Sequence, residues 1–174
     1  MSINDSNVRD ALPSDAESIN EILEKSWLAT YVPLGVPEKA ILDTFFGKEG
    51  RKEKLINYLT TINHGTDIGL VIEVNSKVVG LCFGSKKEGY YLLTQIYIHP
   101  DHIGNNLGSK LINCFIEKTK SLPIKVSVYE KNTYAINFYK KIGFEVIDEK
   151  NIFKLSEDIE LKETVLIRNG VGHY

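Results

Sequence analysis

The sequence lacks several features that mark particular classes of protein. It has two cysteines, Cys82 and Cys114, which lie in apolar runs without metal-ligand spacing, so we expect reduced core residues and no metal site. The net charge is −2, whereas a nucleic-acid-binding protein usually carries an excess of basic residues. No apolar run is long enough to span a bilayer, and Met1–Asp5 does not resemble a signal sequence. We therefore expect a cytoplasmic protein without nucleic-acid or membrane partners.

The composition is that of an ordinary globular protein. The chain has 174 residues, of which 43% are hydrophobic and 25% are charged. This length suits one domain over residues 1–174. The sequence has no internal repeat, linker or low-complexity tract.

Hydrophobic periodicity predicts a mixed-sheet α/β (α+β) domain with about seven strands and about four helices. The predicted helices begin at a Ser14–Glu17 capping box, near Arg51, at Leu107 and at Thr133. The predicted strands are Val8–Ala11, Gly69–Val74, Val78–Phe83, Tyr90–Ile98, Ile124–Val128, Phe144–Ile147 and Glu160–Ile167. Three strands from Gly69 to Ile98 would form an antiparallel meander. The helix from Leu107 would then connect parallel strands.

The segment Ile98–Ser109 is the most informative part of the chain. It joins a strand to a helix through a turn that contains Gly104. Free backbone N–H groups and the positive end of the helix dipole make such a turn an anion site, which suggests a phosphate-bearing ligand. A P-loop or dinucleotide site is excluded, because no Gly-Lys-Ser/Thr follows the turn and the sequence has no G-x-G-x-x-G.

Two motifs resemble those of the GNAT superfamily of N-acetyltransferases. The run Ile96–Pro100, followed by Gly104, Leu107 and Gly108, resembles the acetyl-CoA-binding motif of that family. Downstream, Asn132–Phe144 resembles its Asn-x-x-Ala-x-x-Phe-Tyr…Gly-Phe motif. The resemblance extends over nearly the whole chain through the order of predicted elements. It implies a GNAT-like acyl-CoA N-acyltransferase fold.

The resemblance also implies roles for particular residues. Amides of Ile103–Ser109 would hold the pyrophosphate of acetyl-CoA, and the Ile96–Ile98 backbone would pair with its pantetheine. Asn132 and Tyr139 would face the cofactor, with Tyr139 protonating the leaving thiolate and Ile98 N–H stabilising the oxyanion. The residues assigned to the cofactor are Ile96, Tyr97, Ile98, Ile103, Gly104, Asn105, Asn106, Leu107, Gly108, Ser109 and Asn132.

The chain departs from the family pattern at three positions. Ile103 stands where Gln or Arg is usual, and Asn106 stands where Gly is usual. Asn is the mildest replacement for Gly at a positive φ, so weakened or re-shaped cofactor binding is expected rather than its loss. Leu92 replaces the usual acidic base. The remaining candidates are a water held by Glu130, Asp101 or a tyrosine such as Tyr91.

The resemblance favours transfer of the acetyl group of acetyl-CoA to a primary amine, by direct attack in a ternary complex and without a metal. The acceptor pocket would include Trp27, Tyr31 and Tyr91, although ordinary helix packing also explains Trp27 and Tyr31. The region around Ser26 to Pro37 weakly resembles the polyamine (spermidine/spermine) acetyltransferases. Protein N-terminal or lysine amines, other small amines and a non-catalytic acetyl-CoA-binding module remain alternatives, and a homodimer is left open.

Overall fold

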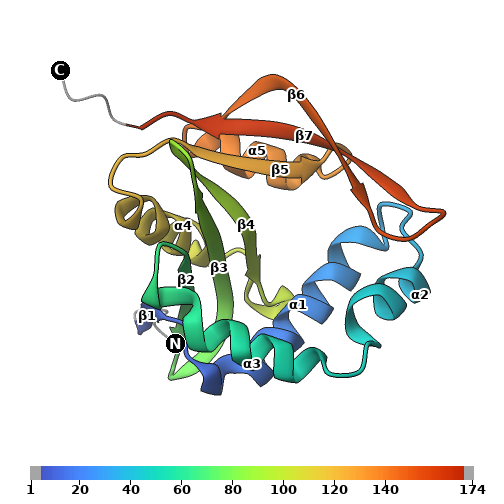
Figure 1. The fold of residues 1–174 in the computed structure, drawn as a ribbon, viewed down its shortest axis with the longest axis horizontal. Coiled ribbons are helices and arrows are strands. Elements are labelled where there is room, and N and C mark those ends of the chain that lie inside the picture. Colours follow the sequence, from blue (N-terminus) through green and yellow to red (C-terminus); the bar gives the residue numbers. More distant parts are fainter. Residues whose placement is uncertain (1–4, 171–174) are drawn as a thin grey trace.

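The computed structural model describes residues 5–170, and seven strands form one mixed sheet in the order β1-β2-β3-β4-β5-β7-β6 (Figure 1). Of the N-terminal segment considered above, Met1 to Asn4 lie outside the described residues. The strands are β1 (Ser6–Asp10), β2 (Ile68–Val74), β3 (Lys77–Lys87), β4 (Tyr90–Ile98), β5 (Ile124–Tyr129), β6 (Glu145–Lys154) and β7 (Glu160–Arg168). The helices are α1 (Ala16–Tyr31), α2 (Glu38–Ile41), α3 (Arg51–Thr61), α4 (Leu107–Lys118) and α5 (Thr133–Lys141). The predicted fold class is confirmed.

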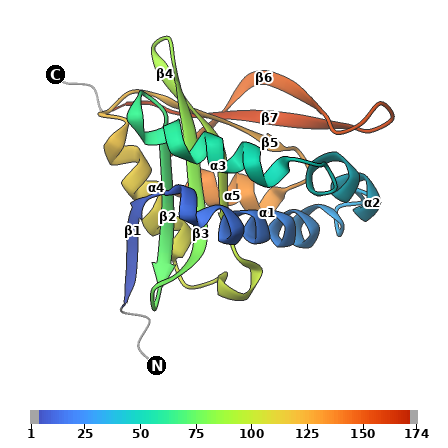
Figure 2. The ribbon, with the colours of Figure 1, turned by 60° about the horizontal axis from the view of Figure 1, so that its bottom comes forward.

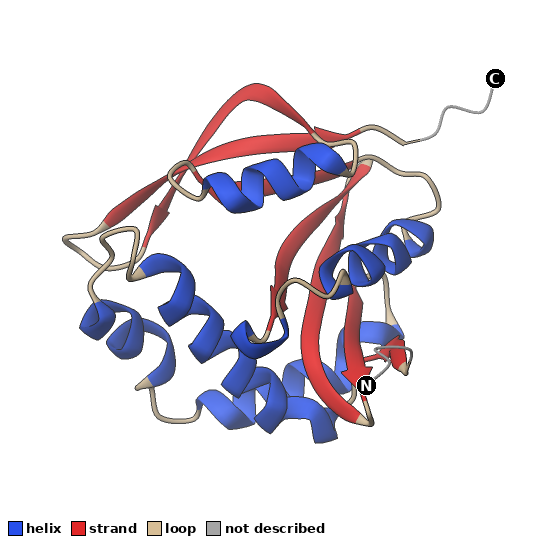
Figure 3. Cartoon of the chain, turned by 180° about the vertical axis from the view of Figure 1, so that it is seen from behind, coloured by secondary structure: helices blue, strands red, loops and turns tan. Residues whose placement is uncertain are grey.

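Helices cover both faces of the sheet. Figure 2 shows α1 and α3 in front of the strands, and Figure 3, from behind, shows α4 and α5 on the opposite face. Beneath α4, Leu111, Ile112 and Phe115 are fully buried against the sheet. Beneath α1 and α3, Ile19 and Leu59 pack in a second cluster. The amphipathic pattern of the helices therefore builds two apolar layers with the sheet between them.

The start of α1 differs from the prediction. Pro13–Asp15 forms a 3-10 turn before the helix, so the proposed Ser14–Glu17 capping box is wrong. The Asp15 carboxylate instead accepts a hydrogen bond from the Leu12 N–H at 2.8 Å and pairs with Arg9 at 2.8 Å. A buried carboxylate tied to strand β1 therefore fixes the entry into the helix.

Strands β4 and β5 separate partway along their length. Their parallel pairing joins Tyr91–Leu93 to Ile124–Val126 and then ends, although β4 continues to Ile98 and β5 to Tyr129. The β3–β4 register shifts where this pairing ends, between Phe83 and Gly84 and opposite Thr94 (Figure 1). The splay leaves one edge of β4 without a partner strand in the middle of the sheet.

Candidate active site

The turn before α4 presents a row of free backbone donors. None of the N–H groups from Ile103 to Ser109 donates to an acceptor within residues 5–170. The last of them belong to the first turn of α4, where no earlier helical carbonyl is available. Together with the positive end of the helix dipole, these donors make a concave site for an anion.

Two residues with positive φ give the turn its shape. Gly104 has φ 93° and Asn106 has φ 57°, the left-handed conformation. Asn106 therefore occupies a position that needs positive φ, and Asn adopts this conformation more readily than other residues with a Cβ. Ile103 is 54% exposed, so its side chain does not fill the site.

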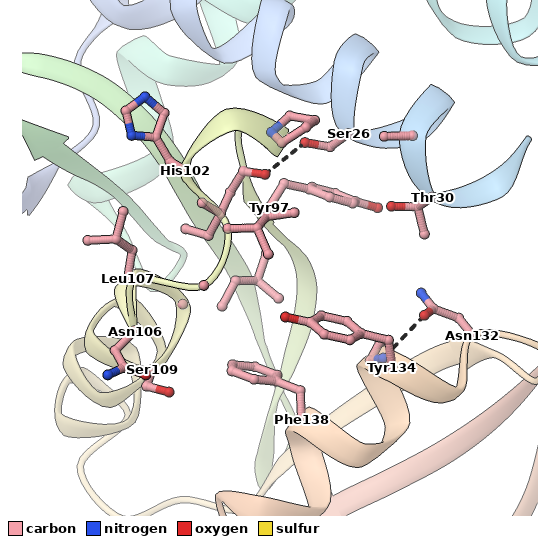
Figure 4. Close-up of a pocket in the computed structure, with 18 of the residues that line it drawn as sticks. Ser26, Thr30, Tyr97, His102, Asn106, Leu107, Ser109, Asn132, Tyr134 and Phe138 are labelled. Carbon is pink, nitrogen blue, oxygen red and sulfur yellow. Dashed lines mark hydrogen bonds between the residues drawn. The ribbon is translucent and has the colours of Figure 1, made fainter. Parts of the chain in front are cut away.

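The open edge of β4 supplies further backbone groups. His99 N–H donates to Val79 O on β3 at 2.8 Å. Because N–H groups alternate sides along a strand, Ile98 N–H points away from β3 toward the splay, and Ile96 N–H points the same way. The Ile98 carbonyl accepts a hydrogen bond from the Ser26 hydroxyl at 3.2 Å (Figure 4). The edge is therefore able to pair with an extended ligand.

A cleft of about 240 Å³ joins the turn, the β4 edge and α5. Figure 4 shows Ser26 and Thr30 of α1 on one side of it and Asn132 and Phe138 on the other. The predicted cofactor residues that line it are Ile96, Tyr97, Ile98, Ile103, Gly104, Asn106, Leu107, Gly108, Ser109 and Asn132. Asn105 is the exception, because its side-chain amide turns back to donate to His102 O at 3.4 Å.

Helix α5 and its N-cap contribute Asn132 and Tyr139 to the polar side chains of the cleft. The Asn132 side-chain oxygen accepts a hydrogen bond from the Ala135 N–H at 3.1 Å and so caps the helix. Tyr139 also lines the cleft and is only 5% exposed. Burial raises the pKa of its phenol well above the ordinary value, which keeps the hydroxyl protonated at neutral pH. Tyr139 is therefore available as a proton donor.

A second pocket, of about 450 Å³, lies on the other side of Tyr97, which borders both spaces. Trp27 and Tyr31 line it, with their rings stacked at a centroid distance of 4.2 Å. Phe45 lies 4.7 Å from Trp27 and 6.1 Å from Phe153, measured between ring centroids. The structure thus places Trp27 and Tyr31 in an aromatic pocket next to the cleft.

Tyr91 was assigned to this pocket, and the structure places it elsewhere. Its ring packs against Phe115 on the α4 face, and its hydroxyl donates to Thr66 O at 3.2 Å. Neighbouring side chains alternate faces along a strand, so Leu92 lines the pocket and Tyr91 does not. Glu130 and Asp101, the other candidates for the base, are exposed and do not line the pocket.

Sequence reasoning missed Glu163, a half-buried carboxylate that lines the aromatic pocket. Burial raises its pKa above the ordinary value. Its signal in the sequence is its place in strand β7, between Leu161 and Val165 on the alternating face that turns inward. Arg51, at the start of α3, lines the same pocket, and burial lowers its pKa.

Neither a metal nor a membrane span is indicated by the described part of the chain. Residues 5–170 hold no group of three or more His, Cys, Asp or Glu side chains arranged to bind a metal ion. In the same range, no helix combines the length and apolar character needed to cross a membrane.

Residues 65–146 match the family described as acetyltransferase (GNAT) domain. Over 94 residues, the chain is 33% identical to an acetyltransferase from Pectobacterium atrosepticum. That match covers 50% of this chain and 64% of the relative, so the chain spans less than two thirds of the relative's length.

Solved structures match over a larger share of the chain. The Thermoplasma acidophilum PaiA N-acetyltransferase, solved with coenzyme A, is 20% identical, with a TM-score of 0.79. That match covers 97% of this chain and 99% of the other. YncA from Salmonella typhimurium, a putative acetyltransferase solved with acetyl-CoA, is 18% identical, with a TM-score of 0.75 over 98% of this chain and 97% of the other. Residues 65–146 are therefore similar to the GNAT acetyltransferase domain, and the chain has the fold of these acetyltransferase structures.

Proposed function

We propose that the protein is an acetyl-CoA-dependent N-acetyltransferase that acts on a primary amine by direct attack in a ternary complex. The observation that carries the proposal is the meeting of two pockets at Tyr97, beside the splay of β4 and β5. One pocket is built for an anion and an extended chain, and the other has aromatic walls. Matches to relatives named acetyltransferases, and to structures solved with coenzyme A or acetyl-CoA, support the assignment.

The residues of the cleft fit acetyl-CoA. The free N–H groups from Ile103 to Ser109 suit its pyrophosphate, and a turn with Asn106 at positive φ keeps them convergent. The unpaired backbone of Ile96 and Ile98 suits the amides of pantetheine, which would add to β4 as an extra strand does. At Gly108 a Cβ would be in ordinary van der Waals contact with the Phe138 ring, at 3.5 Å, so a larger side chain there would extend into the cleft.

Acetyl-CoA supplies a thioester, and the amine nitrogen forms a bond to its carbonyl carbon as the carbon–sulfur bond breaks. Ile98 N–H is the donor placed to stabilise the charge that develops on the carbonyl oxygen. Tyr139 donates its proton to the departing sulfur. The amine nitrogen releases one proton as the amide forms, so the number of protons is conserved. With ordinary pKa values of ~8.5 for a thiol and ~10 for Tyr, full transfer is uphill by roughly 2 kcal/mol. Burial of Tyr139 raises its pKa and increases this cost, so proton transfer requires that burial also raises the pKa of the departing thiol.

The acceptor must reach the thioester as a neutral amine. An alkyl amine with a pKa of ~10.4 is about 0.04% neutral at pH 7, which corresponds to roughly 4.6 kcal/mol. The aromatic walls at Trp27 and Tyr31 desolvate an entering ammonium and so lower its pKa. Leu92 supplies no base at the family's usual position. Desolvation is therefore the main contribution of this pocket to deprotonation.

The acceptor classes to test are polyamines, protein N-terminal or lysine amines, and other small amines. The region from Ser26 to Pro37 supports polyamines through its weak resemblance to that branch. The two cysteines are free thiols, which suits a cytoplasmic enzyme. Release of the CoA thiol from acetyl-CoA with a panel of these amines measures the activity directly.

A non-catalytic acetyl-CoA-binding module is the second candidate, favoured by Leu92 in place of an acidic residue. The same experiment separates the two functions when acetyl-CoA binding is measured in parallel by calorimetry. Thiol release that depends on an amine supports the enzyme. Tight binding without turnover on any amine would refute the enzyme and favour the binding module.

A further inference from the structure

The aromatic pocket contains two charged side chains of opposite sign, and neither forms an ion pair within residues 5–170. Glu163 makes no side-chain hydrogen bond and no ion pair with any residue from 5 to 170. Arg51 donates through Nε to Asn20 Oδ1 at 2.7 Å and lies 4.4 Å above the Phe46 ring, but it pairs with no carboxylate in the same part of the chain. Both side chains are half-buried.

The two charges have different neighbours in the pocket. Glu163 pairs in register with Tyr129 of β5, whose ring centroid is 6.0 Å from that of Tyr31. Arg51 lies against Phe46, at the start of α3. Because the two do not form an ion pair with each other, each remains free to meet a charge on a ligand. Half-buried charges without partners are unfavourable, and a ligand that pairs with them recovers that free energy.

The surroundings of each charge match a different part of a ligand. Near Glu163, the carboxylate suits an amine, and Tyr31 and Tyr129 line the pocket beside it. Near Arg51, the pocket adjoins a second hollow that Lys48, Glu49 and Lys54 also line, where the positive side chains outnumber the negative one. The rest of the lining combines aromatic and aliphatic side chains with the polar Thr94, Gln95 and Ser127. A volume of about 450 Å³ lies in the range of roughly 300–1,000 Å³ typical of small-molecule sites.

We propose that the acceptor is a zwitterion of the amino-acid class, with its amine toward Glu163 and its carboxylate toward Arg51. Its side chain is apolar and lies among Trp27, Phe45 and Phe153. This inference rests on the proposed acetyltransferase function and names the acceptor for that site. Tyr97 borders both the pocket and the cofactor cleft, so an amine held near Glu163 lies next to the site of the thioester. A polyamine fits less well, since one of its charges would lie beside Arg51.

The first test compares matched acceptors with the unaltered protein. Leucine, phenylalanine and methionine are each compared with their α-amides and with the corresponding decarboxylated amines, and kcat/KM is measured from CoA thiol release. We expect the carboxylate form to be preferred by about tenfold or more, because the analogues leave the Arg51 guanidinium unpaired. Amides or simple amines that match the amino acids would overturn the proposal. This comparison requires no substitution, so it does not depend on the folding of a variant.

Substitutions then assign the preference to particular residues. In Arg51→Met, kcat/KM for the amino acids should fall about 10- to 100-fold, while the decarboxylated amines change by less than about threefold. In Glu163→Gln, both acceptor classes should lose activity. Lys52→Met, the same change of charge at an exposed neighbouring position, is the matched control and should leave both unchanged. An equal loss on both classes in Arg51→Met, in protein that still binds acetyl-CoA, would refute the role of Arg51.

Different results refute the proposed acceptor class and the proposed enzyme activity. Turnover of simple amines or polyamines, without a preference for the carboxylate, overturns the zwitterion and leaves the acetyltransferase intact. Binding of acetyl-CoA without turnover on any amine overturns the acetyltransferase itself. In that case, calorimetric titration of leucine, phenylalanine and methionine into the acetyl-CoA-loaded protein tests the pocket alone. Binding of the amino acids over their amides would support the zwitterion site, and no binding would refute it.

Discussion

The two pockets that meet at Tyr97 are built in different ways. The cofactor cleft uses mainly backbone groups, from the β4 edge and the turn into α4, which together form one continuous segment of the chain. The aromatic pocket, where we propose that the acceptor binds, uses side chains from α1, the Leu42–Phe46 turn, α3, β4, β5, β6 and β7. One pocket is therefore set by local conformation, and the other by long-range packing.

This difference determines which changes each pocket tolerates. Backbone donors survive most substitutions, provided that φ remains accessible and no side chain blocks the site. Side-chain walls change their chemistry with every replacement. The cleft should therefore be disrupted by added bulk or charge, whereas the acceptor pocket should be altered by ordinary exchanges. The following predictions test this contrast.

The largest effect is expected for Gly108→Glu. A carboxylate and its added bulk would lie where the cleft receives phosphate, next to Phe138 at the position a Cβ would take. We expect loss of acetyl-CoA affinity by at least about 100-fold in calorimetry, through like-charge repulsion and blocked access. Asn113→Glu, on the exposed side of the same helix, is the control. Retained affinity in Gly108→Glu would show that the phosphate binds elsewhere.

Tyr139→Phe should separate chemistry from binding within the cleft. Removing a general acid typically lowers turnover by about 100-fold or more. The ring remains buried, and the backbone donors are untouched, so the affinity for acetyl-CoA should change by less than about twofold. Tyr90→Phe, at the other end of β4, serves as the control. Unchanged kcat in Tyr139→Phe would mean that another group protonates the thiol.

The sequence was sufficient for the cofactor side because the relevant signals are local. A strand, a turn with Gly104 and a helix start can be read in order. Asn is the mildest replacement for Gly if position 106 needs a positive φ, and the structure gives Asn106 a φ of 57°. The second motif gave Asn132 and Tyr139, and both line the cleft.

The acceptor side was harder to predict, because its residues come together only through tertiary packing. Trp27 and Tyr31 were found by resemblance, but Glu163 and Arg51 were not. The π turn Leu42–Phe46 brings Phe45 to the pocket. Neither this turn nor helix α2 is long enough to show an amphipathic pattern in the sequence. Strand β6 was expected over four residues and spans Glu145–Lys154, because both faces of this edge strand are largely exposed and show no alternation.

Tyr31 gives the aromatic pocket a pH dependence that substitution can isolate. Burial raises the pKa of Tyr31 to about 12, so between pH 10 and 12 the unfolded chain loses this proton while the folded protein keeps it. Stability must then fall as pH rises through this window, by up to roughly 3 kcal/mol for this residue. Denaturant unfolding at several pH values, compared with Tyr31→Phe, isolates the contribution. Equal slopes in the two proteins would contradict the raised pKa.

The smallest effect is expected at Asn106, where the cofactor side depends on conformation alone. With φ at 57°, alanine would be strained by about 1–2 kcal/mol, whereas glycine adopts this angle freely. Asn106→Ala should therefore weaken acetyl-CoA binding by about fivefold, and Asn106→Gly should leave it within about twofold. Calorimetry on the two variants compares a change of backbone freedom with a change of side chain. If both variants lost affinity equally, the Asn106 side chain itself would contact the cofactor, and the cleft would depend on side chains as the acceptor pocket does.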